Sequence, residues 1–535
     1  MQVSTENGLS YQLNQEDFTA SVTVSWMVRG DVVIPRSIQH ESHEYIITSI
    51  NKNAFKENHR LRSIKFSKDS QLHSIGSNSF HGSSILTVTI PSSVKTIESS
   101  AFYMCQRLKT VEFSKDSGLE TIGEEAFSSS SLSSISFPSQ IKQIESRAFY
   151  WCKNLKSVLF GSNSELKFIG SEAFSYTSIE SVSIPSNVIQ IGTNAFAFCG
   201  KLKTIEFQND SKLESIQSHA FCDSAIESIS IPSSVSTIEE FAFSTCKFLQ
   251  NVFFSKNSEL RVIGKYAFYG SLLKSVSIPR HVNRIEESTF SSCENLRKID
   301  FHENSELQSI SKEAFFASSL KSITLPPNVV DLDEGWCNCT FRLTQVLIDA
   351  NNKNFSYVDN EKRIVAKKFE LNENLFSSIV FVSRDVESVL IPSYVKSICS
   401  HAFNGCFKLR KVDFFEDSEL QRIEKDAFSH SPIVSIVIPS KVKAVKEYAF
   451  SCCVHLKAVE LLGDGLAIEN FAFTESDLLL LASLPNAHEV IISGNSFSSV
   501  SNDFSLFISP CAVLNIIAIE SEDEIILTPE DVSFF

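Results

Sequence analysis

Residues 108–149 read LKTVEFSKDSGLETIGEEAFSSSSLSSISFPSQIKQIESRAF, a unit in two parts that recurs along the chain. One fixed point of the unit is an apolar residue followed by a proline, and these prolines lie 47 residues apart, at Pro91, Pro138, Pro185, Pro232, Pro279 and Pro326. A second fixed point is a phenylalanine, usually preceded by alanine, whose spacing alternates between 25 and 22 residues from Phe55 to Phe315. Repetition this regular predicts a solenoid, in which each coil packs only against its neighbours.

Each half of the unit holds one segment of the type Leu-x-x-Val-x-Phe, which is the strand signature of leucine-rich repeats. Its last two apolar residues alternate at period two, so they point inward and the residues between them face outward. We therefore predict a curved leucine-rich-repeat solenoid of about 18 coils, each of about 23 residues. A parallel β-sheet would form its concave face, and short turns or helical segments would form its convex face.

The predicted strand starts keep their spacing as far as Leu343, stop, and resume at Val386. We predict a strand-rich N-terminal cap over 1–31, a repeat array over 32–348, a non-repeat insert over 349–385, a continued array over 386–497 and a C-terminal cap or tail over 498–535. The insert is rich in turn residues, which favours a hairpin, a loop or a short strand pair that stands off the solenoid. Residues 504–519 are apolar but broken by polar residues and a proline, which favours a buried strand pair over a membrane span.

The cysteines mostly follow the repeat. Five of them occupy the position three residues after the phenylalanine, and serine or threonine holds the same position in the coils between them. Coils stack about 4.8 Å apart, so successive cysteines of this column would lie about 10 Å apart, beyond the reach of a disulfide. We predict a buried ladder of free thiols and hydroxyls. It comprises Cys105, Cys152, Cys199, Cys246 and Cys293, and resumes at Cys406 and Cys453, whereas Cys222, Cys337, Cys339, Cys399, Cys452 and Cys511 lie outside it.

Composition narrows the function. The net charge of -15 argues against a nucleic-acid partner, because phosphates require a basic surface. Asp-Ser and Asn-Ser pairs recur once per unit and predict tight turns, whereas too few acids recur to predict a calcium ladder. Residues 1–14 lack the basic and apolar regions of a signal peptide. No phosphate loop, zinc-protease motif or serine-hydrolase motif occurs, and Cys337 with Cys339 provides too few zinc ligands, so we expect a non-enzyme without cofactor or metal.

These residues resemble the BspA-like class of leucine-rich-repeat proteins. The resemblance rests on the unit length, the IPSSV segments at 90–94 and 231–235, the I-G-x-x-A-F turn at 191–196 and the cysteine that follows it, and it covers about residues 32 to 497. Members of this class are typically surface or secreted proteins of host-associated microbes and parasites, and they are implicated in adhesion and aggregation. The resemblance therefore implies a surface or secreted location and partners among the proteins or glycans of host or microbial surfaces.

The outward residues of the strands are the candidate binding site, because the concave sheet is the usual binding face of such a solenoid. Every second strand presents two hydroxyls, and the strands between them carry most of the charge. A flanking row of bases includes Arg62, Lys109, Lys156 and Lys203. The alternative interpretation is a solvated face with no ligand. The candidate residues are Thr110, Glu112, Leu159, Thr204, Glu206, Phe253, Lys298 and Asp300, of which Leu159 and Phe253 are outward apolar exceptions.

Two hypotheses describe a binding protein, and a third, less favoured, is an enzyme whose unrecognised site would lie in the insert or in about the last 40 residues. The first is an adhesin-like surface or secreted protein that binds through the concave sheet, with the 349–385 insert as a second candidate contact. The second is an intracellular scaffold for protein–protein interaction, which the free thiols and the lack of a visible leader favour.

Overall fold

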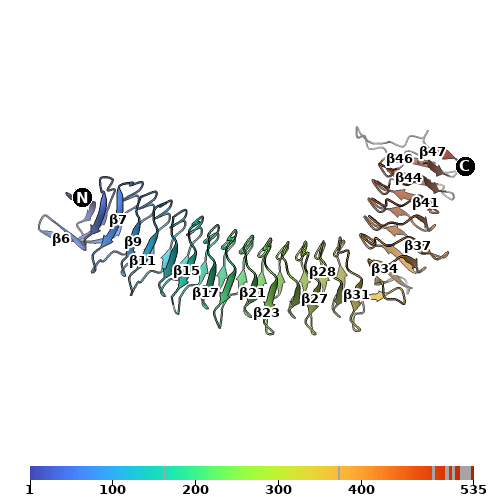
Figure 1. Cartoon of the computed structure of the whole chain (residues 1–535), viewed down its shortest axis with the longest axis horizontal. Helices are drawn as coiled ribbons and strands as arrows, with labels where there is room; N and C mark the ends of the chain where they lie inside the picture. The colour runs from blue at the N-terminus through green and yellow to red at the C-terminus, as the bar shows by residue number, and fades with distance from the viewer. Residues whose placement is uncertain are drawn as a thin grey trace. The chain divides into compact units, whose positions relative to one another are not determined.

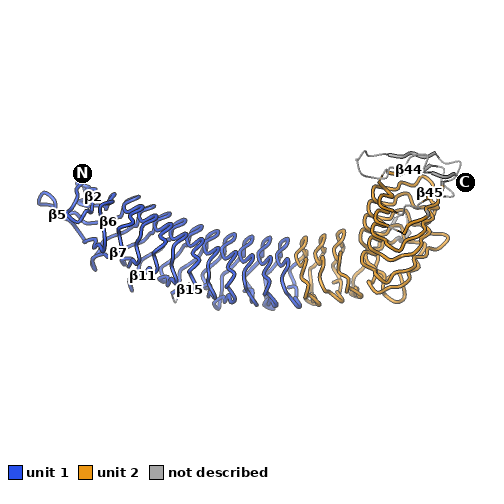
Figure 2. Tube along the Cα trace, turned by 45° about the horizontal axis from the view of Figure 1, so that its top comes forward, with its two compact units in different colours: residues 1–282 blue, residues 283–535 orange. Residues whose placement is uncertain are grey.

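A computed structural model describes residues 1–161, 163–371, 374–476, 478–484, 489–493, 495–500, 505–508, 513–517 and 532–534. The chain forms two compact units, Met1–Val282 and Asn283–Phe535 (Figure 2). Both units consist of stacked coils of strands and turns, so the chain is a leucine-rich-repeat β-solenoid. Among the described residues, no helix has the length and apolar character needed to cross a membrane.

In unit 1, each coil contributes a long strand and a short strand, and like strands of successive coils lie side by side in parallel (Figure 1). The long strands are β4 (Gly30–Ile34), β7 (Leu61–Phe66), β9 (Thr87–Ile90), β11 (Thr110–Phe113), β13 (Ser134–Phe137), β15 (Ser157–Phe160), β17 (Ser181–Ile184), β19 (Thr204–Phe207), β21 (Ser228–Ile231), β23 (Asn251–Phe254) and β25 (Ser275–Ile278). We call the surface formed by their outward side chains the long-strand face. It corresponds to the predicted binding sheet.

The short strands form the opposite wall of each coil in unit 1. They are β8 (Ser74–Ile75), β10 (Thr96–Ile97), β12 (Thr121–Ile122), β14 (Gln143–Ile144), β16 (Phe168–Ile169), β18 (Gln190–Ile191), β20 (Ser215–Ile216), β22 (Thr237–Ile238) and β24 (Val262–Ile263). The isoleucine of each is buried. Between the walls, the serine of the recurrent Asp-Ser or Asn-Ser pair accepts a hydrogen bond from the backbone N–H two residues on, as Ser117 does from Leu119 at 3.4 Å. The pair therefore holds a tight turn, as predicted.

The phenylalanine column fills the space between the walls. From Phe55 to Phe268 each ring stacks on the next, with centroids 4.9 to 5.5 Å apart. The turn that carries each ring is bonded to the next coil, since the Phe102 N–H donates to the Ala126 carbonyl at 2.7 Å. Residues two before and two after the ring have positive φ angles, as Ser100 and Met104 do. This left-handed geometry lets the turn reverse direction twice within a few residues.

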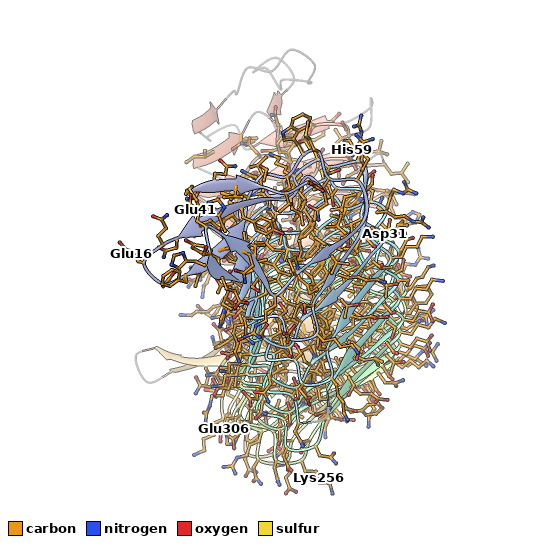
Figure 3. The ribbon with its side chains drawn as sticks, turned by 90° about the vertical axis from the view of Figure 1, so that its left-hand side faces the viewer. Glu16, Asp31, Glu41, His59, Lys256 and Glu306 are labelled. Atoms are coloured by element: carbon orange, nitrogen blue, oxygen red, sulfur yellow. The ribbon has the colours of Figure 1, made fainter. Side chains whose placement is uncertain are left out.

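Unit 1 begins with β1 (Gln2–Ser4), β2 (Ser10–Asn14) and β3 (Thr19–Val22), which pair antiparallel in that order. Strand β3 then pairs in parallel with β6 (His43–Ile50), which also pairs antiparallel with β5 (Ser37–His40) and in parallel with β8 of the short-strand wall. In a view along unit 1 from this end, Asp31 and His59 lie on the opposite side from Glu16 and Glu41 (Figure 3). The N-terminal strands therefore extend the short-strand wall, and Asp31, in β4, lies on the side of the long strands.

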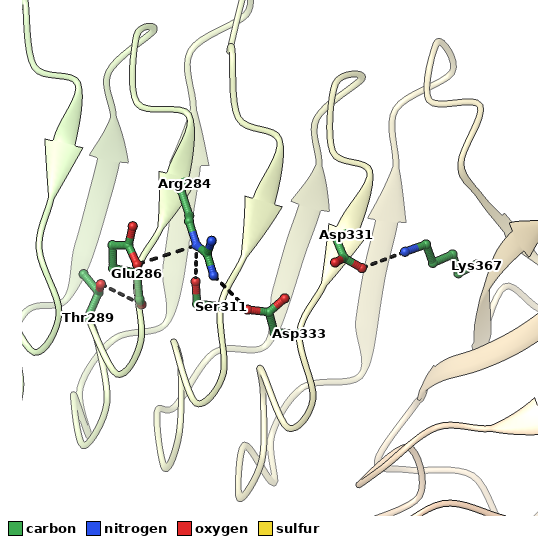
Figure 4. A network of polar contacts seen from close by, with 7 residues as sticks. All are labelled: Arg284, Glu286, Thr289, Ser311, Asp331, Asp333 and Lys367. Atoms are coloured by element: carbon green, nitrogen blue, oxygen red, sulfur yellow. Dashed lines mark hydrogen bonds and ion pairs between the residues drawn. The ribbon is translucent and has the colours of Figure 1, made fainter.

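Unit 2 starts with three coils of the same design. Their long strands are β27 (Lys298–Phe301), β29 (Ser322–Leu325) and β31 (Gln345–Ile348), and their short strands are β26 (Arg284–Ile285), β28 (Ser309–Ile310) and β30 (Asp331–Leu332). The Arg284 guanidinium crosses this short-strand wall, donating to Ser311 at 2.7 Å and pairing with Asp333 at 3.1 Å (Figure 4). Charged side chains therefore tie successive short strands together on the outside of the wall.

The predicted insert is three antiparallel strands, β32 (Phe355–Tyr357), β33 (Ile364–Leu371) and β34 (Asn374–Val382). Strand β34 then pairs in parallel with β36 (Val395–Ile398), so the insert continues into the short-strand wall of the later coils. On its other side, Lys367 of β33 pairs with Asp331 of β30 at 2.7 Å (Figure 4). The insert thus joins the coils that precede it to those that follow it, and the predicted domain boundaries around it stay a prediction.

The later coils of unit 2 repeat the two-wall design. Their short-strand wall contains β38 (Arg422–Ile423), β40 (Ala444–Val445), β42 (Leu466–Ile468), β44 (Glu489–Ser493) and β46 (Val513–Ile517). Their long strands are β35 (Ser388–Ile391), β37 (Lys411–Phe414), β39 (Ser435–Ile438), β41 (Ala458–Leu461), β43 (Leu481–Leu484), β45 (Ser505–Ile508) and β47 (Val532–Phe534). The segment predicted as a strand pair over 504–519 contains two strands, but they do not pair with each other, because β45 lies beside β43 and β47 whereas β46 lies beside β44 in the short-strand wall. Much of the predicted C-terminal tail lies outside the described residues.

The thiol–hydroxyl ladder is present. Cys199 donates to the Phe174 carbonyl at 3.2 Å and contacts the Thr177 hydroxyl at 3.3 Å, and Cys152 repeats this with Phe127 and Ser130. The twelve described cysteines are free thiols, and burial raises the pKa of Cys199 to about 11. Cys511 lies outside the described residues. The ladder thus satisfies the carbonyl of the buried phenylalanine one coil earlier, which explains why only small hydrogen-bonding side chains occupy it.

We expect Phe149→Ala to lower the free energy of unfolding by about 3–5 kcal/mol, because it leaves a cavity between two stacked rings. Loss of one coil contact should also separate the array into two melting transitions, since solenoid coils communicate only through neighbours. Urea denaturation monitored by circular dichroism measures both. Phe168→Ala, at a ring that is 39% exposed on the short-strand wall, is the matched control. An unchanged single transition in the Phe149 variant would contradict the packing described above.

Candidate binding surface

The structure places all eight predicted site residues on long strands. In unit 1, they lie on β11 (Thr110, Glu112), β15 (Leu159), β19 (Thr204, Glu206) and β23 (Phe253), and in unit 2 on β27 (Lys298, Asp300). All are exposed except Asp300, which is half-buried. Leu159 and Phe253 keep 60% and 56% of their surface in solvent, far more than the inward residues beside them. Their role in binding stays a prediction.

Leu159 and Phe253 occupy one row of the sheet. The parallel register sets Ser136 of β13 beside Leu159, and Ser230 of β21 beside Phe253. Four strand steps separate the two apolar residues, a distance of roughly 19 Å at 4.8 Å per step. The sheet between them presents Ser183 and Glu206, which are aligned with each other. The row therefore offers two apolar points separated by hydrogen-bonding groups.

The row has a longer period than the repeat itself. Leu159, Phe253 and Leu347 lie 94 residues apart in the sequence, and so do Glu112, Glu206 and Asp300. Leu347 occupies the same position on β31 of unit 2 and is 45% exposed. Acidic and apolar side chains thus alternate at every second coil, with serine or threonine between. The sequence already contains this 94-residue period, and a search for repeats at twice the 47-residue unit would have found it.

Some of the predicted site residues already form polar contacts within the sheet, which a ligand would have to replace. Lys298 pairs with Asp300 on the same strand at 2.8 Å. Thr89 donates to Glu112 across neighbouring strands at 3.4 Å. Exposed pairs of this kind contribute little to stability and can be broken by a ligand at small cost. Leu159 and Phe253 form no polar contact of this kind with any described residue, so they are the stronger candidates for contact with a macromolecule.

Sequence reasoning missed a second exposed surface, on the turns that follow the phenylalanine column in unit 1. Trp151 and Phe198 are each 40% exposed there. Tyr176 lies between them, with its ring centroid 4.8 Å from that of Trp151 and 4.5 Å from that of Phe198. The Tyr176 ring stacks on that of Phe198 with an interplanar angle of 12°, and it is tilted by 42° against that of Trp151. These ring contacts therefore support the turns, and their signal in the sequence was the aromatic residue two positions after the column phenylalanine.

A buried cation closes the core where the insert meets the coils of unit 2. The Arg384 guanidinium donates to the Ala402 carbonyl at 2.9 Å and contacts the thiols of Cys406 at 3.6 Å and Cys337 at 3.7 Å. It also lies 5.1 Å from the ring centroid of Phe381. Burial raises the pKa of Cys337 to about 11, so the nearby cation does not make the thiol reactive at neutral pH. We assign this cluster a structural role.

His401 and Asp426 lie beside this cluster, on neighbouring turns. The His401 Nε2 is 3.9 Å from the Asp426 carboxylate, too far for a hydrogen bond, so burial determines the charge of each group. Burial lowers the pKa of His401 to about 4 and raises the pKa of Asp426 to about 6. Within the described residues, no group of three or more His, Cys, Asp or Glu side chains is arranged to hold a metal ion.

Comparison with known proteins identifies the repeats. The model of the BspA type leucine rich repeat region matches residues 37–156, 167–260, 257–361 and 374–502. No curated protein matches the chain. A leucine rich cell surface protein from Faecalibacterium prausnitzii is 18% identical, with 97% of this chain and 95% of that chain covered and a TM-score of 0.38. A leucine-rich repeat protein from Bacteroides ovatus is 18% identical, with 94% and 99% covered and a TM-score of 0.39.

The two titratable groups predict opposite effects of pH on stability. The unfolded chain takes up a proton at His401 near its ordinary pKa of 6.5 and the folded chain only near 4, so stability falls as pH drops through that interval. The folded chain binds a proton at Asp426 up to about pH 6, against 3.8 ordinarily, so stability falls as pH rises between these values. Each contribution is on the order of 1–3 kcal/mol.

We therefore expect His401→Asn to reduce the loss of stability in acid and Asp426→Asn to reduce the loss on raising the pH. Asparagine suits both sites because both have positive φ angles. Urea midpoints between pH 4 and pH 7 measure the two slopes. If both variants change the dependence of the urea midpoint on pH in the same direction, burial of His401 and Asp426 does not cause that dependence.

Proposed function

The chain belongs to the BspA type leucine rich repeat family, and from this premise we propose that it is a non-enzymatic, adhesin-like binding protein. Its long-strand face holds proteins or glycans of host or microbial surfaces. The family match supports a role in binding macromolecules, because repeat solenoids present extended surfaces rather than enclosed sites. We propose that the chain acts at the cell surface or after secretion.

The observation that carries the proposal is the row of Leu159 and Phe253. An outward strand position in water favours polar side chains, and the serines beside both residues follow that preference. Two large apolar side chains in one row, more than half exposed, therefore cost solubility without adding to the core. A partner that covers them would recover that cost, and large apolar or aromatic residues commonly supply most of the energy of an interface.

The spacing of the row suits a partner that is long. Contacts about 19 Å apart on a rigid sheet can be occupied together only by an extended or large molecule. Each apolar contact is weak alone, and simultaneous occupation raises the overall affinity because the second contact forms within a complex already made. The hydroxyls and carboxylates between the anchors add hydrogen bonds that select the partner.

The second candidate function is an intracellular scaffold. Its specific support is the set of free cysteines, because oxidising compartments favour disulfides and the cytosol keeps thiols reduced. Burial of the ladder weakens this support, since its thiols are already used as hydrogen-bond donors. Both functions use the same face and differ in location.

We expect the double substitution Leu159→Ser, Phe253→Ser to lower binding of the purified protein to intact epithelial and bacterial cells by about tenfold or more, as loss of interface anchors does. Flow cytometry with labelled protein measures this. The matched control is Phe168→Ser, Val262→Ser, which removes two exposed apolar residues from the short-strand wall of the same unit. Equal loss in both variants would contradict a role for the long-strand face.

Location is tested by labelling intact native cells with a membrane-impermeant biotin reagent. We expect the chain to be recovered among the labelled proteins or from the medium. Its confinement to the soluble lysate, with the medium clear, would instead select the scaffold function and make the lysate the source of partners.

A further inference from the structure

We propose that unit 1 carries a second binding site, for a linear anionic polysaccharide, in a groove lined by Arg107, Lys109 and Lys156. The groove lies where the turns enter the long strands, so it borders the long-strand face and contains neither Leu159 nor Phe253. The inference therefore goes beyond the proposed function and stands without it.

Backbone hydrogen bonds fix the order of the groove. The Lys109 N–H donates to the Leu86 carbonyl at 2.9 Å, and the Lys156 N–H donates to the Ser133 carbonyl at 2.9 Å. The four residues thus follow one another on consecutive coils, with a base on every second coil. The Ser131 hydroxyl donates to the Gln106 carbonyl at 2.7 Å and holds the adjoining turn. The cations are exposed, but the backbone from which they project is rigid.

The three cations have no carboxylate partner among the described residues, and no acidic side chain lines the groove. The same sequence column behaves differently two coils further on, where Lys203 pairs with Glu227 at 3.5 Å. Glu180 lies on the coil between Lys156 and Lys203, and ends the basic stretch. Upstream, the column continues to an exposed Arg62. Unneutralised positive charge therefore collects in one place on a chain whose net charge is -15.

The spacing of the cations selects the ligand. Lys109 and Lys156 are two strand steps apart, about 10 Å, which is comparable with one disaccharide of an extended polysaccharide that carries one anionic group per repeat. Nucleic acid presents a phosphate about every 3.4 Å along each strand, which is a poor match. The Debye length at physiological salt is about 8 Å, so the cations act as separate contacts rather than one diffuse field.

The remainder of the lining also fits a carbohydrate. Gln106, Ser131, Ser133 and Asn154 offer amides and hydroxyls, which are the groups that bond sugar hydroxyls, and Leu86 is the one apolar residue that lines the groove. A protein partner would need an apolar centre to its interface, which this groove lacks. Anionic groups would pair with the cations while the hydroxyls of the chain bond the amides between them.

The test measures binding of the full chain to immobilised hyaluronan, which carries one carboxylate per disaccharide, and to keratan sulfate, which carries about one sulfate per disaccharide. We expect both to bind, with affinity that falls as salt rises. The variant Lys109→Glu, Lys156→Glu should bind at least about tenfold more weakly, a change of about 1.4 kcal/mol. The variant Lys109→Gln, Lys156→Gln should show a smaller loss of affinity. It replaces the glutamate variant in the test if charge reversal disturbs folding.

The matched control is Lys167→Glu, Lys256→Glu, which makes the same change in net charge at two exposed lysines of unit 1 outside the groove. It should retain wild-type binding, and so should Leu159→Ser, Phe253→Ser. Absence of wild-type binding to both polysaccharides would overturn the proposal, and so would equal losses in the groove and control variants. Groove-dependent binding of double-stranded DNA as tight as that of the polysaccharides would overturn it in favour of a general polyanion site.

Discussion

Backbone hydrogen bonding from coil to coil is the constraint on which the rest of this structure depends. A coil of strands and turns has few partners for its own N–H and C=O groups, and buried groups without partners are costly. Each coil therefore needs the next one in register, as the bond from the Phe102 N–H to the Ala126 carbonyl illustrates. The register in turn forces like positions of successive coils into contact. A column of phenylalanines becomes a stack, and a column of cysteines and hydroxyls becomes a ladder.

This dependence explains how much could be predicted from the sequence. Inward positions repeat because one coil's side chain is the next coil's packing partner, so the solenoid, the ring column and the free thiols were readable as periodicities. The outward direction of Leu159 and Phe253 followed from alternation along the strand. Structural features that recur in every coil can therefore be predicted from a single sequence.

Several features that escaped prediction arise where the repeat is interrupted. Before the insert, Cys337 stands where the other coils have the column phenylalanine and Trp336 stands where they have the preceding alanine. The Trp336 ring meets that of Phe381 of the insert at a centroid distance of 6.3 Å. Arg384 enters the same core, although a buried cation is unusual there. Its contacts come from segments far apart in the sequence, which no spacing reveals. The pairing of Lys298 with Asp300 was missed for a similar reason, because alternation sets which way two side chains point and not whether they meet.

The difference between inward and outward residues also shows where to look for a binding function. Inward residues are fixed by packing, so their identity says little about a ligand. Outward residues are free to vary, and serine or threonine satisfies the strand on most of them. Departures from that background therefore require a cause outside the fold. The apolar row at Leu159 and Phe253 is such a departure, whereas the bases at Lys109 and Lys156 lie just before β11 and β15; both sets are spaced by even multiples of the coil. Because the coils stack at a constant spacing, residues that recur at such periods lie at fixed distances from one another. Those distances determine which lengths of partner can contact several of them together.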